Sequence, residues 1–148
     1  MERDATRLDC AFCAIVAGRQ PAIMVYEDEQ VVAFPPIRPA AVGHTLVVPR
    51  QHLRDFWDGD PADVAPVATA AAIVGAAIRR ALRPQGMNLI SSAGEVATQS
   101  VFHLHVHVVP RWKDDHMGQI WPARPPQKSP TRERVAELIR TELAGLRP

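Results

Sequence analysis

The sequence lacks an excess of charge of either sign. Its 148 residues contain 17 Lys and Arg against 16 Asp and Glu, which leaves a formal net charge of +1. Binding to nucleic acid or to a membrane surface usually requires a basic patch or stripe, and this balance indicates neither. The N-terminus has no apolar stretch of the kind found in a signal peptide, and no apolar run is judged long enough to span a membrane. We therefore expect a cytoplasmic protein with no nucleic-acid or membrane partner.

Cysteine is scarce, and both cysteines lie close together. Cys10 and Cys13 form a C-x-x-C pair. A structural disulfide is not expected in a reducing compartment, which leaves metal binding or redox chemistry. The redox interpretation requires a strand directly before the pair. The nine residues before Cys10 are mostly polar and show no strand pattern, which weakens that interpretation.

The chain is long enough for one domain, expected over residues 1–148, and 47% of its residues are hydrophobic. The sequence contains no internal repeat. Periodicity and turn residues predict a helix over 10–20, two strands within 22–34, a strand from His44 to Pro49, a helix over 61–83, a strand starting at Met87, an irregular arm over 112–128 and a C-terminal helix. Short successive strands with inserted helices indicate an α+β fold with an antiparallel sheet.

The C-terminal helix is expected to start at Ser129 as N-cap, with Pro130 as the first helical residue. Its apolar stripe would consist of Val135, Leu138, Ile139, Leu143 and Leu146.

Three of the six histidines alternate with apolar residues in VFHLHVHVVPR, residues 101–111. Such alternation predicts a half-buried strand, which should end near Pro110 because proline cannot donate to a strand ladder. His103, His105 and His107 would then share one face, about 7 Å apart, while Phe102, Leu104, Val106 and Val108 face the core. A polar face in water would suffice for one histidine. Three in register indicate acid–base, nucleophilic, metal-binding or anion-binding chemistry.

A tetrahedral zinc site needs four nitrogen or sulfur ligands, often two cysteines and two histidines. The candidate histidines are His44, His52, His103, His105, His107 and His116. His52 follows the strand that ends at Pro49, and His103 opens the histidine strand. The competing interpretation is two buried free cysteines with unrelated surface histidines, and spacing alone does not separate the two.

The motifs taken together resemble a known family. HLHVHVV, residues 103–109, matches the histidine-triad pattern His-φ-His-φ-His-φ-φ, in which φ is apolar. The run CAFCAIVAGRQPAIMVYEDEQVVAFPPIRPAAVGHTLVVPRQH is similar to the N-terminal half of the Hint-like branch of the HIT (histidine triad) family. ATQSVFHLHVHVVPR resembles the second signature of that family. The resemblance covers most of residues 10–111, which would form the core, with an arm and helix over 112–148.

The resemblance implies a five-stranded antiparallel sheet with a long helix and a C-terminal helix, in a protein that pairs as a homodimer. It implies a hydrolase or transferase that acts on the α-phosphate of a purine nucleoside phosphoramidate or a dinucleoside polyphosphate. His105 would be the nucleophile that forms a nucleotidyl-histidine intermediate, His107 would contact the phosphate, and His44 would support the site. In many bacterial members the pattern also implies a structural zinc ion, here at Cys10, Cys13, His52 and His103.

Substrate contacts are expected from the loop before the triad. The residues are Ser92, Thr98, Gln99, Ser100 and Val101, together with His107 and, from the arm, Trp121. Two positions depart from the family pattern: Pro36 replaces the usual Asp or Asn for the ribose, and Ser92 replaces Asn or Gln. Thr98 stands where glycine is usual beside the phosphate.

These departures leave alternatives open. One is a nucleotide-binding, zinc-stabilised interaction protein with weak catalysis. Another is an enzyme that cleaves polyphosphates by phosphorolysis rather than hydrolysis. In the Hint-like branch a Trp-Pro pair similar to Trp121-Pro122 lies near the partner's active site, so Trp121, rather than Trp112, is expected there. The competing expectation is that both tryptophans fold back on their own subunit.

Overall fold

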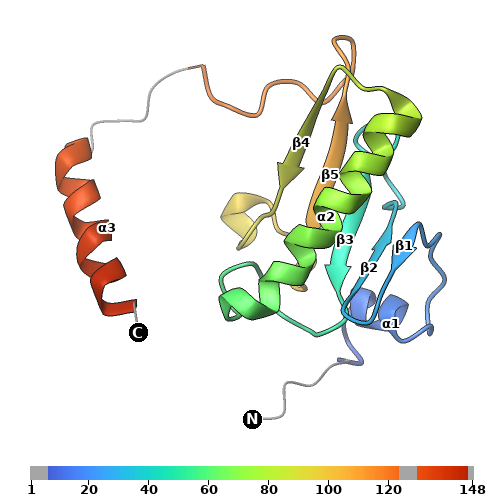
Figure 1. The fold of residues 1–148 in the computed structure, drawn as a ribbon, viewed down its shortest axis with the longest axis horizontal. Helices are drawn as coiled ribbons and strands as arrows, with labels where there is room; N and C mark the ends of the chain where they lie inside the picture. Colours follow the sequence, from blue (N-terminus) through green and yellow to red (C-terminus); the bar gives the residue numbers. More distant parts are fainter. Residues whose placement is uncertain (1–6, 124–129, 147–148) are drawn as a thin grey trace. The chain divides into compact units, whose positions relative to one another are not determined.

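The computed structural model describes residues 7–123 and 130–146 (Figure 1). The chain divides into two compact units, Met1–Met117 and Gly118–Pro148, and each is described by itself.

The first unit contains a five-stranded sheet whose paired neighbours are all antiparallel, with the order β1-β2-β3-β5-β4. The strands are β1 (Tyr26–Glu27), β2 (Val31–Phe34), β3 (Thr45–Pro49), β4 (Gly86–Ile90) and β5 (Val106–Arg111). Thr45 pairs with Val108 between β3 and β5, and Leu89 pairs with Val108 between β4 and β5. The sheet and the helices confirm the α+β fold expected from the sequence.

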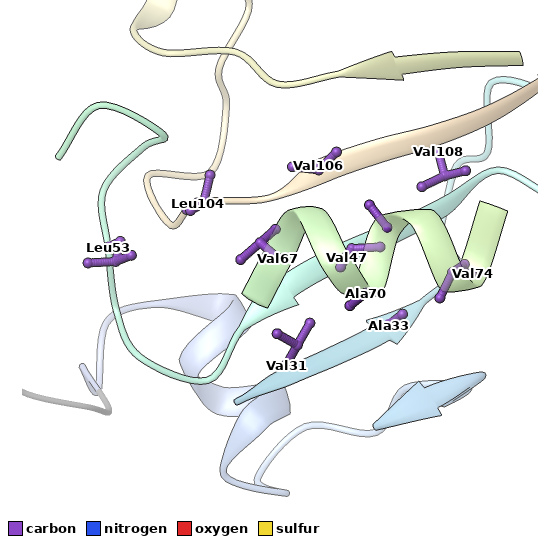
Figure 2. Close-up of a cluster of buried hydrophobic side chains, with 11 residues drawn as sticks. Val31, Ala33, Val47, Leu53, Val67, Ala70, Val74, Leu104, Val106 and Val108 are labelled. Atoms are coloured by element: carbon purple, nitrogen blue, oxygen red, sulfur yellow. The ribbon is translucent and has the colours of Figure 1, made fainter. Parts of the chain in front are cut away.

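The long helix α2 (Pro61–Leu82) covers one face of this sheet. It begins with a capping box between Asp60 and Asp63, has proline at its first position, and ends at Arg83 in the left-handed conformation. Figure 2 shows Val67, Ala70 and Val74 of α2 against valines of the strands. Burying these apolar side chains stabilises the fold by roughly 1.5–3 kcal/mol for each valine.

By length and composition alone, α2 is apolar enough to cross a membrane, although we expected no run of that length. A core helix passes the same test, and four residues of α2 are buried in the described structure: Val67, Ala70, Ala71 and Val74.

The opposite face of the sheet packs against α1 (Ala11–Val16). Phe12 and Ile15 of α1 form a second buried cluster with Val32 and Phe34 of β2. Successive side chains of a strand point to opposite faces. This explains why all four residues of β2 are buried, with Val31 in the α2 cluster and Val32 in the α1 cluster.

The histidine segment differs from the predicted half-buried strand. β5 begins only at Val106, so His103 and His105 precede it. Phe102 is 42% exposed rather than facing the core, whereas His103 and Leu104 are both almost fully buried. The physical reason is that the main chain leaves the sheet here: the Leu104 N–H donates to the Leu53 carbonyl at 2.6 Å. The segment after β3 therefore covers this stretch.

The second unit contains α3 (Arg132–Leu146). The expected cap was partly wrong, because the helix begins at Arg132 and Pro130 precedes it. The Thr131 hydroxyl accepts a hydrogen bond from the Arg134 N–H, as an N-cap side chain does. Ser129 and residues 124–128 lie outside the described residues. The predicted stripe is exposed throughout: Val135, Leu138, Ile139, Leu143 and Leu146.

Candidate functional site

Two cysteines and two histidines gather at the start of α1. The ligand atoms of Cys10, Cys13, His52 and His103 all lie within 4.8 Å of one another. Cys10 is the N-cap of α1, and its sulfur accepts a hydrogen bond from the Cys13 N–H, so one turn of helix aims both thiols the same way. Residues more than 80 positions apart in the sequence thus meet in one cluster.

The spacing of this cluster fits a tetrahedral metal ion. Zn–S bonds of about 2.3 Å and Zn–N bonds of about 2.0–2.1 Å place sulfur and nitrogen ligands about 3.6 Å apart. His103 Nδ1 lies 3.4 Å from the sulfurs of both Cys10 and Cys13, and His52 Nδ1 lies 3.3 Å from the sulfur of Cys13. The donor set of two thiols and two imidazoles is one that zinc prefers. The cluster could therefore hold zinc.

The far side of the His103 ring is also fixed. His103 Nε2 donates to the Pro49 carbonyl at 2.8 Å, which leaves the lone pair of the neutral ring on Nδ1, facing the thiols. A ligating histidine usually donates its other N–H in this way. Burial lowers the pKa of His103 to about 4 and raises that of the Cys13 thiol, and burial also lowers the pKa of His52. The imidazoles are therefore neutral, as ligands must be.

On the other side of the histidine segment, a chain of hydrogen bonds orients two imidazoles. The Ala40 N–H donates to His44 Nδ1 at 3.0 Å, so the proton of neutral His44 is assigned to Nε2. His44 Nε2 lies 2.9 Å from His107 Nδ1 and donates to it. Neutral His107 then carries its own proton on Nε2. Burial and the neighbouring His105 and His44 lower the pKa of His107 to about 4, which keeps it neutral near pH 7.

His105 has the opposite arrangement. Its Nδ1 donates to the His103 carbonyl at 2.7 Å, which leaves the lone pair on Nε2. The ring of Phe12 packs edge-on against the His105 ring, with centroids 5.1 Å apart. His105 is 8% exposed, and burial lowers the pKa of its imidazole. The ring therefore presents an oriented nitrogen lone pair, which is what a nucleophile needs.

The rings of His105 and His107 lie side by side, with centroids 4.9 Å apart. His105 has a lone pair on Nε2, and His107 has an N–H donor on Nε2. The structure records no partner for either of these nitrogens within the described residues. A lone pair beside an N–H donor can attack an electrophilic centre while binding one of its oxygens. This pair is thus suited to attack on an electrophilic centre that carries an oxygen atom.

Gln99, one of the expected substrate contacts, lies in the loop before the triad. The side chain of Gln99 is 4% exposed, and its amide is used entirely by the main chain: it donates to the Arg54 carbonyl at 2.7 Å and the Val101 carbonyl at 3.2 Å and accepts from the Gly94 N–H at 2.8 Å. The main-chain N–H groups of Thr98 and Gln99 also donate within the loop. Gln99 therefore holds the loop rather than offering its amide to a substrate.

Two main-chain donors of this loop stay available. Across the described part of the chain, no acceptor is recorded for the N–H groups of Ser100 and Val101. Both residues also line a cavity of about 350 Å³ beside the metal-ligand cluster, with Arg7, Asp9, Cys10 and His52, and neither His105 nor His107 is among its lining residues. Successive free N–H groups favour an anion.

Thr98 lies in this loop with φ of +70°, in the left-handed region. A β-branched residue is rarely found there, and glycine is the usual choice. The replacement of glycine noted in the sequence is therefore a real source of backbone strain.

Some site residues could not be found from the sequence. The partners that set the histidine tautomers are main-chain groups of Ala40, Pro49 and His103, which leave no side-chain pattern to read. The Ser91 hydroxyl, which donates to the His105 carbonyl at 3.2 Å, and the ring of Phe12 were likewise missed. The C-x-x-C pair could have indicated Phe12, because this residue lies between the two cysteines and directly precedes Cys13 of α1.

The remaining expected residues differ in how exposed they are. His116 is exposed and is not a member of the metal-ligand cluster. Ser92 and Pro36 are half-buried, and proline offers no side-chain group to a ribose. Trp121 belongs to the second unit and is 82% exposed.

Comparison with known proteins identifies the family. The HIT domain profile matches residues 17–114. The chain is 40% identical over 114 residues to "Protein hit" of Bacillus subtilis, covering 76% of this chain and 79% of that protein. It is 30% identical over 115 residues to "Adenylylsulfatase HINT3" of Arabidopsis thaliana, covering 78% of this chain and 58% of that protein.

A solved structure extends the match over nearly the whole chain. The zinc-bound histidine triad family protein of Mycobacterium smegmatis is 41% identical, with a TM-score of 0.70, and the match covers 94% of this chain and 96% of that one. The sequence motifs, the sheet and the histidine arrangement agree with these comparisons. The chain belongs to the HIT family.

Proposed function

We propose that the protein is a nucleotide hydrolase or transferase that acts on the α-phosphate of a purine nucleoside phosphoramidate or dinucleoside polyphosphate. The reaction would pass through a nucleotidyl-histidine intermediate on His105. The observation that carries this proposal is the hydrogen bond from His105 Nδ1 to the His103 carbonyl, because it leaves the Nε2 lone pair free beside the His107 donor. A relative described as an adenylylsulfatase supports cleavage at a nucleotide phosphate.

The proposed reaction has two displacements. In the first, the Nε2 lone pair of His105 forms a bond to the α-phosphorus, and the leaving group departs with the electron pair of the broken bond and takes a proton from solvent. In the second, water attacks the phosphorus, releases the nucleoside monophosphate and a proton, and restores neutral His105. His107 Nε2–H would hold a phosphoryl oxygen in both steps, oriented by His44.

We assign the substrate contacts as follows. The free N–H groups of Ser100 and Val101 would bind the phosphate, with the Ser100 hydroxyl, while Ser92 and Thr98 would lie beside the nucleotide. Gln99 would act indirectly, by holding the loop. Pro36 offers the ribose no side-chain acceptor, so ribose recognition is expected to differ from that of other Hint-like proteins.

We propose one structural zinc ion per chain, held by Cys10, Cys13, His52 and His103. Their spacing supports this, as does the zinc-bound relative. Four protein ligands make a closed site, so the ion would stabilise the connection between α1 and the segments around it rather than bind substrate.

We also propose a cytoplasmic homodimer in which residues 1–148 act as one HIT domain. Strand β4 is at the sheet edge, where Leu89 is 63% exposed. A groove of about 320 Å³ beside it is lined by small residues of α2, among them Ala72 and Gly75. An edge strand next to small side chains is suited to pairing with a second copy. Trp121 would then lie near the partner's nucleotide site.

The direct test is chemical trapping. The wild type and His105→Ala are incubated with a labelled adenosine phosphoramidate and quenched under acid and under alkaline conditions. We expect a labelled wild-type protein whose label is stable in alkali and lost in acid, and no label on His105→Ala. Equal labelling of both proteins would reject His105 as the nucleophile.

The alternative is a nucleotide-binding, zinc-stabilised interaction protein with weak catalysis. The missing side-chain acceptor at Pro36 favours it. A panel of adenosine phosphoramidates, dinucleoside polyphosphates and AMP, assayed for turnover and for binding, separates the two functions. Inorganic phosphate as the acceptor separates phosphorolysis from hydrolysis. Tight binding without turnover of any of these compounds would support the alternative.

A further inference from the structure

We infer that Cys10 and Cys13 form a redox-sensitive pair, in which a hydroperoxide oxidises the two thiolates to a disulfide and the chain thereby releases its metal. This inference rests on the proposed zinc site and not on the proposed catalytic activity. Three observations carry it: the unequal exposure of the two cysteines, the cavity beside Cys10, and the position of both cysteines on one helical turn. The cluster would then be a site of reversible modification as well as a structural site.

The two cysteines differ in their access to solvent. Cys10 is half-buried and lines the cavity of about 350 Å³ beside the metal-ligand cluster, whereas Cys13 is fully buried and is not among the lining residues. Arg7, Asp9 and Ser100 also line this cavity, so its wall offers charged and polar groups to a small hydrophilic molecule. A cavity of this volume holds several waters, each of which occupies about 30 Å³ in the liquid. A hydroperoxide can therefore reach Cys10 before Cys13.

The two thiols are placed to form a disulfide. Cys10 is the N-cap of α1, in an extended conformation, and its sulfur accepts a hydrogen bond from the Cys13 N–H at 3.5 Å. Both sulfurs belong to a cluster whose ligand atoms all lie within 4.8 Å of one another. Residues three apart on a helix have Cβ atoms about 5–6 Å apart, and a disulfide requires about 3.5–4.5 Å. Because the N-cap residue lies outside the regular helix, a small change in its backbone brings the two sulfurs together.

The proposed oxidation has two steps, and a thiolate is the nucleophile in each. In the first, the Cys10 sulfur attacks a hydroperoxide: a sulfur–oxygen bond forms, the oxygen–oxygen bond breaks, and the departing alkoxide or hydroxide takes a proton from solvent. In the second, the Cys13 sulfur attacks that of Cys10: the disulfide forms, the sulfur–oxygen bond breaks, and the departing hydroxide is protonated to water. Two thiolates thus lose two electrons, and one hydroperoxide gains them.

Disulfide formation removes two of the four ligands at once. The remaining imidazoles of His52 and His103 do not complete a tetrahedral site, so the chain would release the ion. Helix α1 would stay on the sheet, because Phe12 and Ile15 remain packed in the buried apolar cluster with β2. The oxidised protein would therefore be folded but less stable, and reduction with added zinc would restore it.

The test uses zinc-loaded protein and hydrogen peroxide. Zinc release is followed with a chromogenic chelator, free thiols are titrated, and peptide mass mapping locates the cross-link. Cys10→His removes the attacking thiol but keeps a zinc ligand. Ile15→Val is the matched control, because it loosens the packing of the same helix α1 and leaves both thiols unchanged. A trap for sulfenic acid compares Cys10 in Cys13→Ser with Cys13 in Cys10→Ser.

We expect the wild type and Ile15→Val to lose about one equivalent of zinc and both free thiols, to gain a Cys10–Cys13 link, and to recover after reduction with added zinc. Cys10→His should keep its zinc under the same treatment, because its one thiol, Cys13, is fully buried. The trap should label Cys10 in Cys13→Ser and leave Cys13 in Cys10→Ser unlabelled. A purely structural pair would keep both its thiols and its zinc in the folded protein.

Three results would overturn the inference. The first is a folded wild type that keeps its zinc and both thiols in peroxide, and the second is equal zinc release from Cys10→His. The third is much faster release from Ile15→Val, which would mean that the oxidant enters by opening of α1 rather than through the cavity. If Cys10→His does not bind zinc, the cross-link and the trap decide.

The two proposals can fail separately. Zinc content before peroxide tests the proposed zinc site by itself, so a metal-free wild type rejects that site, and the Cys10–Cys13 link alone then decides this inference. Nucleotide turnover enters none of these measurements, so a failure to turn over any nucleotide rejects only the proposed catalytic activity.

Discussion

The metal-ligand cluster and the triad use the same side chain in two different surroundings. In the cluster, the free nitrogen of His103 faces two thiols, and the residue is fully buried. In the triad, His107 stays half-exposed, and its Nδ1 faces Nε2 of His44, whose Nδ1 accepts from the Ala40 N–H. The neighbours of each ring, rather than the residue type, therefore decide whether a histidine suits metal binding or chemistry on a substrate.

The two regions also differ in the partners of their buried rings. Burial lowers the pKa of both His103 and His105. Both ring nitrogens of His103 have polar neighbours, whereas no partner is recorded for Nε2 of His105 within the described residues.

His105→Ala should reduce turnover by several orders of magnitude, because loss of a covalent nucleophile typically costs that much in rate. Metal content should stay at the wild-type value, since His105 is not a member of the cluster. Steady-state kinetics and metal analysis on the same preparation check both. A variant that retained most of its activity would contradict the proposed mechanism.

Cys13→Ser should lose most of the bound metal, because it removes a fully buried ligand. We expect about one equivalent of zinc per wild-type chain purified without chelator, and a clearly lower melting temperature for the variant. His116→Ala is the control, since its ring is exposed and outside the cluster, and it should bind as much zinc as the wild type. A wild type with two free thiols and no metal would reject the zinc site.

His44→Phe should lower kcat about 100-fold, because the ring keeps its size but no longer donates to His107 Nδ1. His107 could then place its proton on either nitrogen. KM and the melting temperature should change little. An unchanged kcat would show that His107 does not need this partner.

Gln99→Met should lower the free energy of unfolding by about 1–3 kcal/mol, since the buried loop groups that bond its amide lose their partner. Urea titration measures this. If Gln99 instead contacted substrate directly, the main effect would be on KM, with stability close to that of the wild type.

Thr98→Gly should raise the free energy of unfolding by about 0.5–1 kcal/mol, because glycine removes the backbone strain at φ of +70°. The greater conformational entropy of glycine in the unfolded chain offsets part of this stabilisation. The same urea titration gives the sign. Val96→Gly is the comparison, because Val96 is fully exposed in the three-residue helix η1 (Glu95–Ala97). This substitution should destabilise the loop. Loss of stability in Thr98→Gly would mean that its side chain compensates for the strain.

Much of the fold could be predicted because its signals are local. The apolar spacing of 61–83 predicted α2, and alternation placed Leu104, Val106 and Val108 in the core. The same alternation failed at Phe102, because the main chain bonds to Leu53 before β5 begins. A period-2 pattern describes a strand within a sheet and carries no information about a segment that has left it.

The sequence by itself determined the family, the sheet with its long helix, and the inventory of thiols and imidazoles, because each depends on side chains and their spacing. The tertiary structure decided which histidines meet and which nitrogen of each carries the proton. Cys10 and Cys13 reach His103 only through folding, and the protons of His44, His103 and His105 are set by main-chain groups of Ala40, Pro49 and His103. Every residue has such main-chain groups, so only their positions in space distinguish them.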